Sequence, residues 1–152
     1  MSTNIFYLAV PALLVAGGVS AAEKSLKLAS LPPAVQKTVQ EQSKGGTIRG
    51  LSKEIEDGKT FYEAELKING HNKDLLIDPA GSVVEAEDEV ALDSVPAAVK
   101  EAIQKHAAKG QIVIVEAVSK NGSIIAYEAK IKTAGKTSEV RLSPDGSPAK
   151  EP

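Results

Sequence analysis

Residues that commonly carry catalysis are scarce in this sequence. There are two histidines and no cysteine, which removes thiolate nucleophiles and thiolate metal ligands. His71 lies in the Asn-Gly-His-Asn segment 69–72, a composition typical of a solvated turn. His106 flanks the apolar stripe of a predicted helix, and neither histidine has the i, i+4 partner of a zinc-binding helix.

Serine is abundant, but no serine occupies the Gly-x-Ser-x-Gly pattern that exposes a nucleophile. The Gly-Ser pairs at 81–82, 122–123 and 146–147 are typical of turns. We therefore predict that the protein is not an enzyme. No pattern in the sequence indicates a cofactor.

An acidic run, Glu-Ala-Glu-Asp-Glu at residues 85–89, is the clearest candidate for cation binding. Carboxylate oxygens suit Ca²⁺, but this run lacks the ligand order of a calcium-binding loop. Runs of like charge are usually solvated. We interpret residues 87–89 as an acidic connector between two structural units, with weak calcium binding as the alternative.

Two segments alternate between apolar and charged residues with a period of two, which indicates half-buried strands. Tyr62 and Leu66 belong to the apolar set of the first segment, and Tyr127 and Ile131 to that of the second. Within each segment, the residues that alternate with this apolar set point to the opposite side. Together they would form one polar face with a single aromatic side chain. The predicted partner-binding residues on it are Phe61, Glu63, Glu65, Lys67, Glu128, Lys130 and Lys132.

This polar face has two interpretations. A mixed-charge surface with one aromatic anchor can bind a partner, because interface energy concentrates in a few aromatic and charged residues. Alternatively, the Glu and Lys residues form ordinary cross-strand pairs that only keep the protein soluble.

The segments that must position these residues repeat along the chain. Residues 30–35, SLPPAV, resemble residues 94–99, SVPAAV, 64 residues later. Beyond a glycine turn the spacing becomes 65, so that residues 62–64 match residues 127–129. A length change inside a turn is typical of duplicated units, because turns absorb insertions and strands do not. We predict two repeats, residues 23–87 and 88–152.

Each repeat begins with a serine N-cap candidate, Ser30 or Ser94, and a proline near the first helical position. Apolar residues at helical spacing follow, and glycine ends each predicted helix. Asp-Gly at 57–58 and Asn-Gly at 121–122 predict hairpin turns after strands near 47–56 and 111–119.

The predicted fold class is α+β, a tandem repeat of a helix followed by a three- to four-stranded antiparallel sheet, with the helices packed on one sheet face. Further strands are expected at 75–77, 82–87 and 140–142. Because a unit of about 65 residues buries a low fraction of its surface, we expect the two repeats to share a core or a continuous sheet.

The first residues have the pattern of a signal peptide. Residues 5–18 carry no charge, and small residues follow that permit cleavage after Ala21 or Ala22. We predict a signal peptide over residues 1–22 and a periplasmic or secreted location in a bacterium. The apolar run is shorter than the roughly 20 residues of a spanning helix, so we expect no stable membrane insertion after processing. An uncleaved anchor is the alternative.

Three motifs of each repeat resemble the PepSY-like domains, a group described as beta-lactamase-inhibitor-like. They are the opening LPPAV or VPAAV, the YEA strand, and the closing DPAGSVV or SPDGSP turn. The resemblance covers residues 26–150 as two copies. It implies an exported helix-plus-sheet module that binds or inhibits other proteins, peptidases especially, and it carries over no catalytic residue. The sequence departs from the true beta-lactamase inhibitors in lacking cysteine and tryptophan.

The formal net charge of -2 leaves no basic surplus for phosphates, which argues against nucleic-acid binding. We predict an exported, non-enzymatic binding module that inhibits or regulates an envelope peptidase or another protein through the sheet face opposite the helices. Its partner would be a protein or peptide in the cell envelope. The alternative is a structural envelope protein without a specific ligand.

Overall fold

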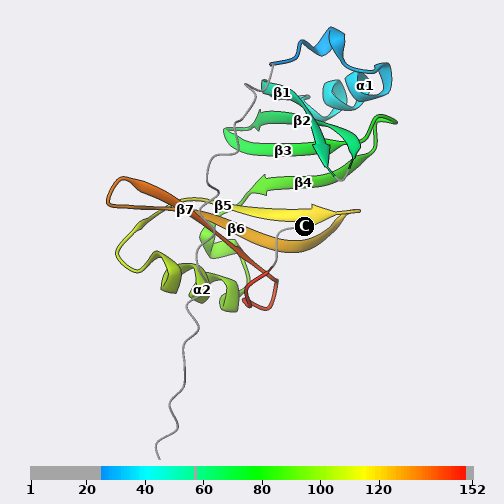
Figure 1. Ribbon diagram of the computed structural model, residues 1–152. Coiled ribbons are helices and arrows are strands. Elements are labelled where there is room, and N and C mark those ends of the chain that lie inside the picture. Colours follow the sequence, from blue (N-terminus) through cyan, green and yellow to red (C-terminus); the bar gives the residue numbers. More distant parts are fainter. Residues whose placement is uncertain (1–24, 57, 150–152) are drawn as a thin grey trace, which may run out of the picture.

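The computed structural model describes residues 25–56 and 58–149 (Figure 1). Seven strands form one antiparallel sheet in which the order across the sheet follows the order along the chain. The strands are β1 (Gly46–Glu56), β2 (Lys59–Ile68), β3 (His71–Ile77), β4 (Val83–Glu89), β5 (Gln111–Lys120), β6 (Ser123–Thr133) and β7 (Lys136–Leu142). The predicted signal peptide, residues 1–22, lies outside the described residues.

Two short helices accompany the sheet, each preceded by a 3-10 turn. The helical elements are η1 (Leu28–Ser30), α1 (Pro33–Gln42), η2 (Leu92–Ser94) and α2 (Ala97–Ala107). The predicted serine caps are wrong, because Pro32 and Pro96 hold the N-cap positions. Ser30 and Ser94 instead end the 3-10 turns and donate their hydroxyls to the carbonyl three residues earlier. No helix in the described ranges is long and apolar enough to cross a membrane.

The predicted fold class, a tandem helix-plus-sheet repeat with the helices packed on one sheet face, is wrong. The structure is a single seven-stranded antiparallel sheet with two short helices. The sheet is continuous because β4 pairs with β5, from Glu85 opposite Lys120 to Glu89 opposite Glu116. The acidic run is therefore part of strand β4 and not a connector. Backbone pairing on both sides of β4 outweighs the tendency of a charge run to stay solvated.

Buried apolar residues of the described ranges form two separate clusters. Of the two arrangements that we expected, the continuous sheet is therefore present and the shared core is not. The first cluster contains Leu31, Val35, Val39, Leu51, Ala64, Leu66, Leu75 and Ile77. The second contains Val95, Val99, Ile103, Val115, Ala117, Tyr127, Ala129 and Leu142. Directly paired residues share a face, so the strand register places both clusters on the same side of the sheet. The predicted inward positions of Leu66 and Tyr127 are confirmed.

Two glycine turns lie directly against the helices. Gly81, after β3, has φ +88°, and a Cβ there would lie 2.8 Å from the carbonyl oxygen of Ala34 in α1. Gly146, after β7, has φ +83°, and a Cβ there would lie 2.7 Å from the carbonyl oxygen of Ala98 in α2. Only glycine combines this backbone conformation with this approach. Each turn thereby fixes the position of one helix.

Candidate binding site on the polar sheet face

The sheet face opposite the two apolar clusters carries the alternate side chains of the strands, and we call it the polar face. Strand pairing aligns Glu65 of β2 with Asp74 of β3, and Asp74 with Glu87 of β4. The next row aligns Glu116 of β5 with Glu128 of β6. The polar face therefore collects carboxylates from five consecutive strands.

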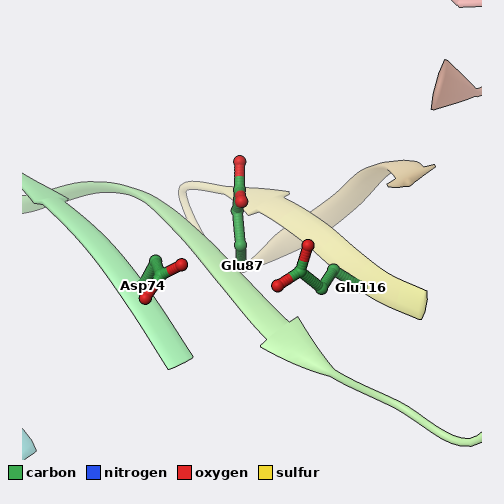
Figure 2. Close-up of side chains that lie close together, drawn as sticks. All are labelled: Asp74, Glu87 and Glu116. Atoms are coloured by element: carbon green, nitrogen blue, oxygen red, sulfur yellow. The ribbon is translucent and has the colours of Figure 1, made fainter. Parts of the chain in front are cut away.

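Three carboxylates converge at the centre of this face. Asp74, Glu87 and Glu116 come from β3, β4 and β5, and one carboxylate oxygen of each lies within 4.8 Å of the others. Figure 2 shows the three side chains on neighbouring strands, with Glu116 directed toward the other two. Glu116 is only 2% exposed. Three negative charges at this spacing repel one another, and burial strengthens the repulsion.

The proton affinity of the cluster reflects this repulsion. Burial, reinforced by the charges of Glu116, Glu63 and Glu65, raises the pKa of Asp74 to about 6. Burial, followed by the charges of Glu128, Glu116 and Glu85, raises the pKa of Glu87 to about 7. Both carboxyls therefore exchange protons close to neutral pH.

Cationic side chains compensate some of these carboxylates but not all. Lys130 Nζ lies 3.4 Å from Glu116 Oε2, and Lys120 Nζ lies 2.8 Å from Glu85 Oε2. Burial disfavours the charged form of Lys130, yet the neighbouring carboxylates, Glu116 foremost, raise its pKa above the ordinary value. In contrast, the side chains of Asp74 and Glu87 make no hydrogen bond or ion pair with any residue that the structure describes, although the nearby charge of Lys130 acts to lower the pKa of Asp74.

A second charged group lies where β6 meets β7. Arg141 forms an ion pair with Glu128, and both side chains are more than nine-tenths buried. Arg141 Nε is buried without a hydrogen-bond partner in the described part of the chain. Burial and the neighbouring Glu128 carboxyl raise the pKa of Glu139 to about 7. Because of Arg141 and Glu139, the polar face extends to β7, the last strand.

Three adjoining hollows follow the polar face, and we call them together the polar groove. The first, about 690 Å³, is lined by Phe61, Leu76, Val84 and Glu85 among others. A small one, about 120 Å³, shares Leu76 and Glu85 with it and adds Asp74 and Glu87. The last, about 440 Å³, shares Asp74 with the small one and extends to Glu116 and Lys130. The central carboxylates thus lie in the middle of a continuous depression.

Two β-bulges shape the last hollow. The register shifts between Ile48 and Gly50 in β1 and between Ile112 and Ile114 in β5. The extra residues, Arg49 and Val113, both line this hollow. Because bulges increase strand twist and redirect side chains, they account for the presence of Arg49 and Val113 in this hollow.

The structure places most of the predicted partner-binding residues along the groove. Phe61 lines the first hollow, Glu63 the small one, and Glu65, Lys67 and Lys130 the last. Glu128 lies on the same face but is occupied by Arg141. Lys132 is exposed and lines none of the three hollows. Whether these residues bind a partner stays a prediction.

The residues at the centre, Asp74, Glu87 and Glu116, were not predicted from the sequence. The acidic run has the period-two alternation of a strand, with glutamates at positions 85, 87 and 89. We interpreted the run as a solvated connector because of its charge, and this alternation was overlooked. Glu116 is the single charge in the apolar stretch 112–118. A lone carboxylate in a run with the composition of a buried strand signals a buried charge, and this signal is present in the sequence.

The central carboxylates are also the residues best placed to hold a cation. Each offers one oxygen, which makes three protein ligands, whereas Ca²⁺ takes six to eight oxygens. Glu116 is already paired with Lys130. Of the acidic run 85–89, for which calcium binding was the alternative interpretation, only Glu87 takes part in this cluster.

The fold is that of known proteins. The chain is similar to a "putative periplasmic protein" of Bacteroides eggerthii at 19% identity and a TM-score of 0.61, covering 79% of this chain and 86% of that one. It is similar to a DUF2874 family protein of Bacteroides ovatus at 21% identity and a TM-score of 0.57, covering 80% and 86%. A BLIP-like protein of Bacteroides fragilis matches at 17% identity and a TM-score of 0.52, covering 78% and 83%.

These matches define the class of the protein by its fold alone. The BLIP-like match agrees with the beta-lactamase-inhibitor-like part of the sequence resemblance. Membership of the PepSY-like domains stays a prediction, whereas the tandem helix-plus-sheet repeat is replaced by one continuous sheet. The first match agrees with the predicted periplasmic or secreted location. No known protein family and no curated protein matches the sequence.

Proposed function

We propose that the protein is an exported, non-enzymatic module that binds a protein or peptide of the cell envelope through its polar face. On this proposal it inhibits or regulates its partner, and an envelope peptidase is the partner that the PepSY-like resemblance favours. The BLIP-like and periplasmic names of the structural neighbours support a binding module in the periplasm.

The observation that carries the proposal is the pair of carboxylates inside the polar groove, Asp74 and Glu87, neither of which forms an ion pair within the described part of the chain. Asp74 and Glu87 have raised pKa values, so the folded protein holds them in an arrangement that opposes their charged forms. Groups held against their own electrostatic preference are typical of functional sites, because stability alone would not retain them. A partner that supplied positive charge would relieve the repulsion.

The alternative is a structural envelope protein without a specific ligand. A structural protein should have polar side chains scattered over its sheet, whereas a binding module should have a contiguous site. The continuity of the three hollows favours the binding module.

Affinity capture with two charge-swapped baits tests the proposal. The mature chain from residue 23 serves as wild-type bait in an envelope extract. The polar-face bait carries Glu65→Lys with Lys67→Glu, and the control bait carries Glu101→Lys with Lys105→Glu on the exposed side of α2. Both swaps leave the net charge unchanged.

We expect the wild-type and control baits to retain the same partner and the polar-face bait to lose it. Equal retention by all three baits would place the binding surface elsewhere. Retention of nothing above an empty matrix would favour the structural alternative.

A further inference from the structure

The polar groove differs in charge along its length, and this difference indicates what can occupy it. The first hollow is balanced in charge, with Lys59 and Lys120 beside Asp78 and Glu85, and it also contains Phe61 and Leu76. The small hollow at the centre is lined by five carboxylates, Glu54, Glu63, Asp74, Glu85 and Glu87, and by no lysine or arginine of the described residues. A cation is therefore attracted to the centre more strongly than to the first hollow, whereas an apolar group fits the first hollow.

We infer that the polar groove binds an extended segment of a protein partner, with a lysine or arginine side chain against Asp74 and Glu87 and an apolar side chain beside Phe61. This inference rests on the proposed function and specifies the chemistry of the partner.

The cluster already receives one ammonium group from the protein itself. Lys130 Nζ approaches Glu116 Oε2 at 3.4 Å from one side of the cluster. It makes no ion pair with Asp74 or Glu87, and within the described ranges Arg49 and Lys67, which line the last hollow, make no ion pair with any of the three carboxylates. A second cationic side chain, entering from the open groove, would balance the remaining charge. Charge-assisted hydrogen bonds to carboxylates are among the strongest contacts available to such a side chain.

The spacing of the two subsites follows from the strands. Every second residue of a strand points to the same face, and two such residues are about 6.6 Å apart along the strand. Leu76 and Asp74 are two positions apart on β3, and Phe61 and Glu65 are four positions apart on β2. The apolar and acidic subsites are therefore about 7–13 Å apart. An extended segment covers that distance between residues i and i+2 or i and i+4.

Binding of a cation at this centre is coupled to proton release. The charged groups that face Asp74 and Glu87 come from β1, β2, β4, β5 and β6. The acidic ones are Glu54, Glu63, Glu65, Glu85, Glu89, Glu116 and Glu128, and the basic ones are Arg49, Lys67 and Lys130. Acidic groups predominate, so the Asp74 and Glu87 carboxyls, whose pKa values are about 6 and about 7, must lose protons near those pH values to meet a cation. Affinity for the cation therefore rises with pH up to about pH 8.

Calorimetry with a defined peptide tests the inference. The probe is an acetylated and amidated nonapeptide, Ser-Thr-Phe-Thr-Ser-Thr-Arg-Thr-Ser, which places its two side chains at i and i+4. One matched peptide replaces arginine by citrulline, which keeps the shape and removes the charge. Another replaces phenylalanine by alanine. The mature protein is compared with Asp74→Asn combined with Glu87→Gln, and with Glu101→Gln as an exposed control.

We expect the probe to bind with a release of protons that is larger at about pH 6.5 than at about pH 8. Citrulline, and separately the Asp74→Asn, Glu87→Gln variant, should each weaken binding at least about tenfold, as loss of a charge-assisted contact does. Glu101→Gln should leave the affinity within about twofold. The double variant removes a repulsion, so its melting temperature should not fall, and weaker binding cannot then be assigned to unfolding.

Three results would overturn the inference. The first is absence of binding at millimolar peptide, and the second is equal affinity for the arginine and citrulline peptides. The third is binding of CaCl₂ at the cluster with no binding of the peptide. If the envelope partner is still captured by the Asp74→Asn, Glu87→Gln variant, this inference fails while the proposed function stands.

Discussion

The two faces of the sheet are made by the same strands but differ in what they bury. One face buries Leu66 and Leu75 among other apolar side chains, each about 1% exposed. The opposite face buries Glu116 and places Asp74 and Glu87 beside it. The first arrangement stabilises the folded chain, and the second opposes it. The comparison indicates that apolar packing and clustered charge are divided between opposite sides of one sheet, and our proposal assigns recognition to the charged side.

Truncation of a buried apolar side chain should produce the largest change in stability. Leu66→Ala or Ile131→Ala should lower the free energy of unfolding by about 2–5 kcal/mol, because each buried side chain leaves a cavity. Urea denaturation measures the change. The control is Ile55→Ala, since Ile55 is 69% exposed. A loss below about 0.5 kcal/mol for both core variants would mean that the faces are reversed.

Substitution of the glycines in the turns that contact the helices should have the next largest effect on stability. Gly81→Ala and Gly146→Ala should each cost about 1–3 kcal/mol, because a Cβ meets the helix backbone and the positive φ is strained. Gly122→Ala separates the two causes, since Gly122 has φ +77° and a Cβ added there would meet nothing within 4 Å. Equal melting temperatures for the three variants would show that the turns do not hold the helices.

Neutralising the central carboxylates should have a smaller effect of opposite sign. Because the groups are partly exposed and solvent screens them, we expect Asp74→Asn or Glu87→Gln to stabilise the protein by about 1 kcal/mol near pH 8. Glu101→Gln is the control. Chemical denaturation of either variant that shows a loss of stability would contradict the predicted repulsion.

The same carboxyls predict the direction of the pH dependence. The folded protein holds their protons up to about pH 6 for Asp74 and pH 7 for Glu87, whereas ordinary values are 3.8 and 4.5. Between these limits the folded state binds more protons than the unfolded state, so their contribution to stability falls as pH rises and is lost above about pH 7. Denaturation at a series of pH values should show this slope in wild type and a reduced slope in the double variant.

Phe61 should give the smallest change in stability. It is half-buried at one end of the groove, away from both apolar clusters, so Phe61→Ala should change the unfolding free energy by less than about 1 kcal/mol. Binding to the captured partner should nevertheless weaken severalfold, because aromatic residues dominate interface energy. Unchanged affinity, measured at equal melting temperature, would remove Phe61 from the site.

Strands and buried positions were largely predictable because both depend on local patterns. The alternation around Tyr62 and Tyr127 gave the correct inward residues, and strands predicted near 47–56 and 111–119 match β1 and β5. The sequence predicted a shared core or a continuous sheet but not which strands would join, because β4 and β5 are separated by α2 in the chain. The pairing of these two strands makes the sheet continuous.

The centre of the candidate site was missed for the same reason. Asp74, Glu87 and Glu116 meet only because β3, β4 and β5 are neighbours in the sheet. The sequence could assign a common face to Phe61, Glu63, Glu65 and Lys67 because all four lie on one strand, where spacing alone sets the face. Residues on one strand can be grouped from the sequence, whereas residues that meet across strands require the topology.

Strand order has a consequence for how the chain reaches this structure. Each of the described strands pairs with its neighbours in the sequence, including across α2, and with no other strand of the described ranges. Sheets built from neighbouring segments have a low contact order, which favours rapid folding. A chain that emerges with its N-terminus first can therefore add each new strand to an edge that is already formed. Such stepwise growth shortens the time during which unpaired strand edges are open to aggregation.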